Sequence, residues 1–352
     1  MSMATTERRV EQRAGVFFEG GEQIARDRIT LRLRGCQGAK FVLERQLVRV
    51  DGVTLTQVFT VKNEAALHDF ATADPYGDNL RATYQSIRQC YLAERDAAPT
   101  LRIANQSVVD VAREINKIEH CQDEAELMAV AHTVTSSLGA TQYIFSLIVL
   151  DDKSGDAIEH RYLVGCDPAW LNKYIDRVWY MNDPLLEYAK RNVTPALSSR
   201  LDLYSDDHWL PTEAKAHGFR NNLVCPVHVR GNHGGTNSLV AMLQASNGES
   251  TEIGEGVLWR NRPMLRALTC ELLDWHLAGQ RQQATSEFGL DDQELDVLRR
   301  LRGGGTAKNV AEAMGLSVKT VYATVYPKVN KKMGATHITN AVAMAVNSGL
   351  IE

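Results

Sequence analysis

Three polar side chains in the middle of the chain are spaced so that they could hold one small molecule. Trp170 and Tyr174 stand at i and i+4 and would share one face of a helix. That face would present an indole N–H and a phenol, and Asp183 adds a carboxylate acceptor. Donors for carbonyl oxygens, an acceptor for an amide N–H and apolar walls for a tail suit a small signal with a polar head.

The same three residues also fit a purely structural role. Trp170 and Tyr174 can be ordinary core aromatics. Asp183 followed by Pro184 is a good helix N-cap with proline at the first helical position. Spacing alone therefore leaves both interpretations open.

The C-terminal end carries a more specific pattern, that of a helix-turn-helix. Asp291 can cap a helix whose N3 residue is Glu294, which makes a capping box, and Gly303–Gly305 ends that helix. Ser317 can cap a third helix after a turn that contains Gly315. We expect further helices from Thr306 to Met314, from Val318 onward and from Thr339 to Asn347.

The charge of this segment agrees with a nucleic-acid partner. From Val297 to Ile351 there are eight Lys or Arg residues against one acid, Glu312. Phosphate contacts from such residues supply much of the affinity for DNA. Without the motif, a solvated basic face would explain the charge equally well.

This segment resembles the C-terminal DNA-binding domain of the LuxR family of bacterial quorum-sensing receptors. Residues at the family's motif positions are Glu294, Val297, Leu298, Gly304, Thr306, Ser317, Thr320, Val321, Lys332, Gly334 and the closing Gly349-Leu350-Ile351. Base contacts in helix-turn-helix proteins come from the N-terminal part of the recognition helix. The residues expected to read bases are Lys319, Thr320, Tyr322 and Ala323, and those expected to reach phosphates are Lys328, Lys331 and Lys332.

The recognition helix departs from the family pattern. Between Val321 and Lys332 the chain carries one residue more than the family has, and Pro327 lies inside this stretch. Proline in a regular helix removes an N–H and clashes with the preceding turn, at a cost of about 3 kcal/mol. We predict that a π-type bulge absorbs both features, which would alter sequence preference without abolishing DNA binding.

The middle segment resembles the acyl-homoserine-lactone receptors of the same family. The resemblance implies that Trp170 donates to the lactone carbonyl, Tyr174 contacts the acyl carbonyl and Asp183 accepts from the amide N–H. The family's second pocket tryptophan is replaced by Ser198, and a common glycine by Asn222. Losing the aromatic should enlarge or polarise the pocket, unless Trp179 or Trp209 fills the gap.

The predicted fold class is α+β. Residues 1–103 form an N-terminal extension, which opens with a polar arm and continues as a small α/β unit with an Asp51-Gly52 hairpin. Residues 104–280 form a sensor domain in which helices flank a mainly antiparallel sheet. A polar linker over 281–289 leads to the all-α helix-turn-helix domain over 290–352.

Composition excludes several other classes of protein. Hydrophobic residues make up 44% and charged residues 23%, with a net charge of −4, which is ordinary for a soluble globular chain. No apolar run is long enough to cross a membrane, and no secretory signal is present, so we expect a cytoplasmic protein with reduced cysteines. We find no hydrolase, metalloprotease or P-loop motif, and expect neither an enzyme, a metal site nor a cofactor.

We therefore expect a homodimeric transcriptional regulator that binds a small signal and an inverted-repeat DNA site. The resemblance implies a signal of the acyl-homoserine-lactone type. Two alternatives stay open. One is a regulator that needs no ligand, suggested by Ser198 and Asn222. The other is an antagonist that forms mixed dimers with a related regulator, suggested by Pro327 and by residues 1–103, whose role the sequence does not reveal.

Overall fold

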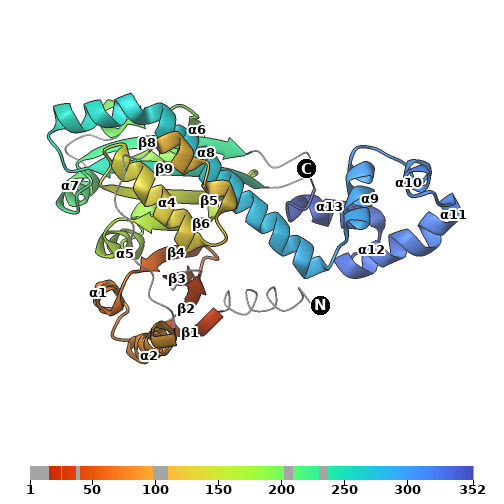
Figure 1. The fold of residues 1–352 in the computed structure, drawn as a ribbon, viewed down its shortest axis with the longest axis horizontal. Coiled ribbons are helices and arrows are strands. Elements are labelled where there is room, and N and C mark those ends of the chain that lie inside the picture. The colour runs from red at the N-terminus through yellow and green to blue at the C-terminus, as the bar shows by residue number, and fades with distance from the viewer. Residues whose placement is uncertain are drawn as a thin grey trace, which may run out of the picture. The chain divides into compact units, whose positions relative to one another are not determined.

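The strands of the protein form a single sheet in the part of the chain that the computed structural model describes, residues 16–24, 26–36, 40–97, 110–201, 209–229 and 237–351. The sheet has nine strands in the order β1-β2-β3-β4-β6-β5-β9-β8-β7 (Figure 1). Their bounds are β1 Val16–Ile24, β2 Asp27–Cys36, β3 Lys40–Val48, β4 Thr54–Val61, β5 Gln142–Asp151, β6 Ala157–Gly165, β7 Ala196–Leu197, β8 Asn221–Val229 and β9 Asn237–Asn247.

The N-terminal extension is not a separate sheet but contributes four of the nine strands, β1–β4. Its strand β4 pairs in parallel with β6, from Thr54 opposite Glu159 to Val58 opposite Leu163. The predicted hairpin forms between β3 and β4, with Gly52 at φ +89°. A parallel pairing between strands so distant in sequence has no local signal, so the sequence could not reveal it.

The first described residues of the N-terminal extension form a strand. Residues 16–24, a stretch rich in Glu and Gly, form the edge strand β1, which pairs with β2 from Val16 opposite Arg34 to Ile24 opposite Asp27. Strand propensity is low here, but backbone hydrogen bonds to β2 make up for it. Residues 1–15 lie outside the described range.

Neighbouring residues Glu44 and Arg45 of β3 show how the two faces of the sheet are covered. Arg45 binds Asp74, which ends α1 (Glu64–Ala73), so α1 lies on one face together with α2 (Arg81–Ala97). Glu44 pairs with Arg34 and Arg161, which both bind Glu124 at the start of α4 (Glu124–Ser137) on the opposite face.

The helix α8 runs from Thr251 to Phe288 and packs beside the end of α4, where Asn261 Nδ2 donates to the carbonyl of Leu138 at 2.9 Å (Figure 1). The residues predicted to form a polar linker are the last turns of this helix. They stay helical because Ala284 and Phe288 pack into the hydrophobic core of the C-terminal segment.

Contacts divide the described chain into two units, and the boundary falls within α8, between Leu272 and Leu273. The second unit is largely the C-terminal segment. Its helices are α9 (Asp292–Arg302), α10 (Ala307–Met314), α11 (Val318–Thr320), α12 (Tyr326–Met333) and α13 (Ile338–Asn347), as the sequence predicts. Within the described residues, no helix is both apolar and long enough to span a lipid bilayer.

The predicted π-type distortion is present in the recognition helix. A π-helical turn, η6, covers Val321–Val325 between α11 and α12, and Pro327 follows in the first turn of α12. The extra residue is therefore taken up by one wide turn, which leaves Val321 at its start and Val329 in α12 both fully buried.

Candidate ligand cavity and DNA-binding surface

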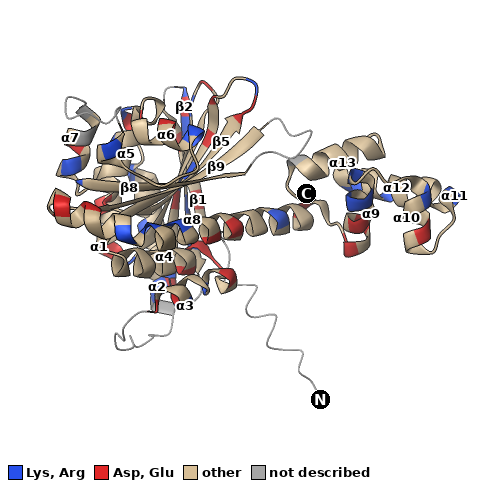
Figure 2. Ribbon diagram, turned by 90° about the horizontal axis from the view of Figure 1, so that it is seen from above, with Lys and Arg blue, Asp and Glu red and all other residues tan. Residues whose placement is uncertain are grey.

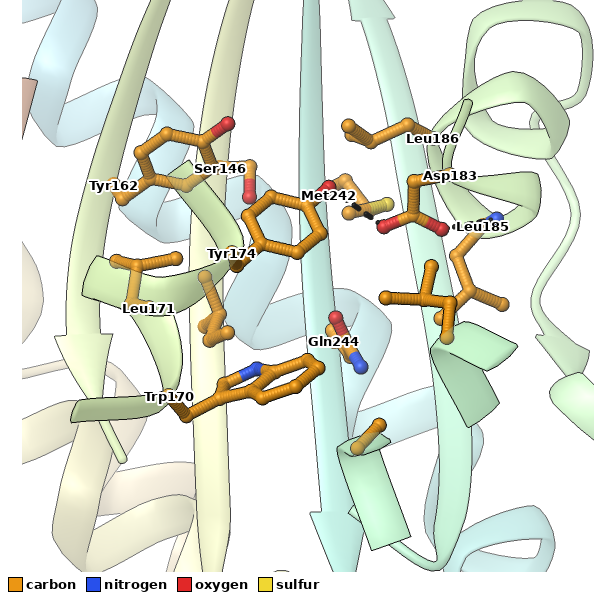
Figure 3. A pocket seen from close by; sticks show the side chains of 13 residues that line it. Ser146, Tyr162, Trp170, Leu171, Tyr174, Asp183, Leu185, Leu186, Met242 and Gln244 are labelled. Carbon is orange, nitrogen blue, oxygen red and sulfur yellow. Dashed lines mark hydrogen bonds between the residues drawn. The ribbon is translucent and has the colours of Figure 1, made fainter. Parts of the chain in front are cut away.

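A small cavity lies in the first unit, between one face of the sheet and three short helices (Figure 3). The helices are α5 (Pro168–Asp176), α6 (Pro184–Arg191) and α7 (Trp209–Ala216). The cavity is lined by Ile144, Ser146, Tyr162, Trp170, Leu171, Tyr174, Asp183, Leu185, Leu186, Leu210, Ala214, Met242 and Gln244. All three residues that the sequence singled out for a ligand are among them.

Local helix signals place these three side chains. Asp167 caps α5 and Pro168 begins it, so that Trp170 and Tyr174 project from one face of this helix into the cavity. Asp183 caps α6, where its Oδ1 accepts from the backbone N–H of Leu185 at 2.7 Å. Its Oδ2 accepts from the hydroxyl of Tyr174, also at 2.7 Å (Figure 3). Asp183 thus fills the structural role and faces the cavity at once.

The cavity is small, with a volume of about 20 Å³. That is enough for roughly one water molecule and too little for an acyl-homoserine lactone. The expected enlargement next to Ser198 is absent: Ser198 is buried but does not line the cavity. Instead, the ring of Trp179 lies 5.8 Å from that of Trp170, and Phe219 lies equally close. The side chain of Trp209 lies outside the described part of the structure.

Sequence reasoning missed further polar residues of the cavity wall. Gln244 of β9 lines the cavity, and its Nε2 donates to Asn222 Oδ1 at 2.9 Å. Asn222, which stands where the family commonly has glycine, is fully buried and so fixes the Gln244 amide. Ser146 and Tyr162 add hydroxyls from β5 and β6. Their alternation with apolar neighbours marks only a sheet face, so no pattern in the sequence distinguishes them from core residues.

A buried histidine lies next to this wall. His160 of β6 is almost fully buried, and its Nδ1 lies 3.2 Å from the hydroxyl of Tyr162. Burial, and to a smaller extent the positive charge of Lys190, lower the pKa of His160 to about 4. His160 is therefore neutral at physiological pH.

The second unit places the predicted base-reading residues at the start of the recognition helix. Ser317 caps it, with its Oγ accepting from the backbone N–H of Thr320 at 3.1 Å. Lys319 and Ala323 are exposed, and Tyr322 is 62% exposed although it is a large aromatic residue. Figure 2 shows Lys and Arg on the helices α9 to α12 of this unit. An exposed, capped helix start of this kind can enter a DNA groove.

Two of the three lysines predicted to reach phosphates are engaged within the protein. Lys332 Nζ lies 2.6 Å from Glu294 Oε2, and Lys328 Nζ lies 2.9 Å from Glu294 Oε1. Burial would raise the pKa of Glu294, but hydrogen bonds from Lys332, the Asp291 backbone and Lys328 lower it. These lysines therefore hold α12 against the start of α9. Lys331 is exposed.

The fold and the two sites define a class of protein, a sensor region with an internal cavity joined to a helix-turn-helix unit. Family models agree with this division: residues 123–269 match the autoinducer binding domain, and residues 289–345 match the bacterial regulatory proteins of the LuxR family. Together the two matches cover more than half of the chain. The chain belongs to the LuxR family of quorum-sensing transcriptional regulators, which bind DNA and a small signal and are not enzymes.

Individual relatives are distant. The chain is 23% identical over 191 residues to the transcriptional activator AhyR of Aeromonas hydrophila, across 53% of this chain and 71% of that protein. AsaR of Aeromonas salmonicida matches to the same extent. Among solved structures, Escherichia coli SdiA is similar at 17% identity and a TM-score of 0.45, over 68% of this chain and 97% of SdiA. The autoinducer-domain match begins at residue 123, so β1–β4 and α1–α2 lie outside it.

Proposed function

We propose that this regulator is a homodimer that responds to an N-acyl homoserine lactone and binds an inverted-repeat DNA site. The observation that supports the ligand class is the convergence of Trp170, Tyr174 and Asp183 on one cavity. In this proposal the indole N–H of Trp170 donates to the lactone carbonyl, and the phenol of Tyr174 donates to the acyl carbonyl. Asp183 accepts from the amide N–H of the ligand.

Ligand entry requires the cavity to open. The Tyr174–Asp183 hydrogen bond connects two of the three proposed ligand contacts, so a bound lactone has to rearrange it. The acyl chain then takes space now closed by apolar wall residues such as Leu210 and Met242. Because a signal stabilises only the state that it binds, it shifts the chain toward this open state.

For DNA, we propose that Lys319, Thr320, Tyr322 and Ala323 contact bases and that Lys331 contacts phosphate. Lys328 and Lys332 are expected to act mainly through their ion pairs with Glu294, which hold the recognition helix in place. The long helix α8 is the proposed dimer surface. Two copies would then read half-sites about one helical turn apart.

The direct test of the ligand proposal is thermal unfolding with a panel of N-acyl homoserine lactones. A lactone at a hundred times its Kd should stabilise the chain by about 2.7 kcal/mol. Asp183→Asn keeps a capping oxygen for α6 but loses the carboxylate charge, so its shift should be smaller. Asp167→Asn is the matched control, because Asp167 is also an Asp-Pro cap but does not line the cavity.

A regulator that needs no ligand is the second candidate, and the small volume of the cavity favours it. It would show no thermal shift with any lactone, while gel shifts would still show DNA binding. The mixed-dimer antagonist would instead fail to bind any DNA at low salt and would form heterodimers with a related regulator. The helix start supports DNA binding, because Ser317 caps it and Val318–Thr320 are α-helical, with the π-turn taking up the extra residue after them.

A further inference from the structure

Residues outside the autoinducer-domain match share a core with the ligand cavity. Leu55 and Phe59 of β4 belong to the same hydrophobic cluster as Trp170 and Tyr174. α1 also packs beside α5, the helix that carries both aromatic residues. The N-terminal strands and helices are therefore part of the surroundings of the cavity.

A chain of buried hydrogen bonds runs from this N-terminal segment to α5. Arg45 of β3 binds both carboxylate oxygens of Asp74 at 2.8 and 3.0 Å, and its Nη1 donates to Gln57 Oε1 at 3.0 Å. Gln57 Nε2 then donates to Asn172 Oδ1 of α5 at 2.9 Å. These four side chains are 5% exposed or less.

Arg45 sets the direction of the hydrogen bonds in this series. A guanidinium group only donates hydrogen bonds, so the Gln57 amide must turn its oxygen toward Arg45 and its N–H toward Asn172. Asp74 holds Arg45 in a two-bond fork and accepts a third hydrogen bond, at 2.8 Å, from the hydroxyl of Tyr84 in α2. Because each donor and acceptor is buried, breaking one link leaves groups without partners.

Asn172 lies on the back of α5 relative to the cavity. Trp170 and Tyr174 share the cavity face, and a residue midway between them points to the other side of a helix with 3.6 residues per turn. The Gln57–Asn172 bond therefore fixes α5 from behind. With α5 fixed, the room for a ligand has to come from the other walls of the cavity.

We propose that Gln57 and Asn172 are positioning residues of the ligand site, and that through them the N-terminal segment sets which acyl chain lengths are accepted. This inference rests on the proposed lactone-binding function. A fixed α5 holds the polar head of the ligand at one place, so the remaining wall limits the length of the tail. Releasing α5 lets the polar head shift, which weakens the discrimination between short and long acyl chains.

The experiment measures Kd for N-butanoyl and N-octanoyl homoserine lactone by calorimetry on the full-length chain. The variants are Gln57→Leu, Asn172→Leu and the double variant. Thr56→Val is the matched control, because Thr56 is the next residue on β4, is 2% exposed and points to the opposite face of the sheet. Unfolding temperatures without ligand are recorded for all chains, and Asn172→Leu alone suffices if Gln57→Leu does not fold.

We expect each single variant to weaken binding of the preferred lactone about tenfold, as for one lost buried hydrogen bond, and to bring the two Kd values closer together. The double variant should lose no more lactone affinity than either single variant, because all three variants break the same Gln57–Asn172 hydrogen bond. Thr56→Val should bind like the parent chain.

Two results would overturn the inference, and they differ. If the parent chain binds a lactone and Asp183→Asn weakens it, but Gln57→Leu and Asn172→Leu lower only the unfolding temperature, then the hydrogen-bond chain is purely structural. If no lactone binds the parent chain, the proposed function fails and this inference fails with it.

Discussion

The two ends of the chain are held by different kinds of contact. In the N-terminal segment, Gln57 bonds to Asn172, 115 positions later, and β4 pairs with β6. In the C-terminal segment, the two hydrophobic clusters draw only on residues from Ala284 to Ile351. The first end is therefore inseparable from the sensor region, whereas the second is complete by itself.

Truncation should show this difference most strongly. Deleting residues 1–103 removes four strands and much of the shared core, so the remaining sensor region should not fold cooperatively. Deleting residues 290–352 should leave a sensor region that unfolds near the temperature of the parent chain. Tryptophan fluorescence measures both, because no tryptophan follows residue 290. Cooperative unfolding of the first truncation would contradict the comparison.

The ion pairs at the two ends of the chain should differ in how much they stabilise the fold. Arg45→Met leaves the buried carboxylate of Asp74 uncompensated and should cost about 3–5 kcal/mol of unfolding free energy. Lys332→Met leaves Glu294 still paired with Lys328 and should cost only about 1 kcal/mol. Urea unfolding followed by circular dichroism compares the two. Equal losses of unfolding free energy would show that the more buried ion pair is not the more stabilising one.

The recognition helix offers a test of local compensation. Deleting Thr324 removes the extra residue, and a regular helix would then bring Pro327 against the preceding turn at a cost of about 3 kcal/mol. Combining the deletion with Pro327→Ala should recover most of that loss. Thermal unfolding of a chain beginning at residue 281 isolates the effect. If the single deletion is as stable as the parent, the π-turn and the proline are not coupled.

Acid should affect the sensor region first. Burial lowers the pKa of His160 from 6.5 to about 4, so the unfolded chain binds a proton that the folded chain excludes. Stability should therefore fall by about 3 kcal/mol as pH falls from 6.5 to 4. The pKa of Glu294 is lowered by its lysine partners. Its contribution to stability is therefore complete above the ordinary carboxylate pKa of about 4.5 and is lost as the pH falls below that value.

His160→Phe isolates the histidine contribution. The substitution keeps a buried ring next to Tyr180 but cannot be protonated. Urea unfolding monitored by tryptophan fluorescence should show a shallower pH dependence between pH 6.5 and 4 than in the parent chain. An unchanged slope would assign the acid sensitivity to other groups.

The sequence predicts the C-terminal unit well because its signals are local. The capping box of Asp291 and Glu294, the Ser317 cap and the π-turn before Pro327 all depend on residues a few positions apart. The Asp-Pro motif likewise predicts the capping role of Asp183, whereas its place at the cavity was implied by the family resemblance.

Long-range contacts are what the sequence did not reveal. The β4–β6 pairing and the Gln57–Asn172 bond join segments with no shared local pattern. Trp179 and Phe219 pack against Trp170, and Ser198 does not line the cavity, so the place of the family tryptophan in the sequence does not indicate the cavity's size. The continuation of α8 through Phe288 was missed because polar residues hide the few that are buried, such as Ala284.

The most direct test of the central claim is whether a lactone changes DNA binding by this chain. Fluorescence anisotropy with an inverted-repeat duplex selected by the full-length protein gives its affinity with and without N-octanoyl homoserine lactone. A ligand-responsive regulator should show a changed DNA affinity that Asp183→Asn reduces and Asp167→Asn retains. A DNA affinity that is the same with every lactone of the panel would contradict the claim.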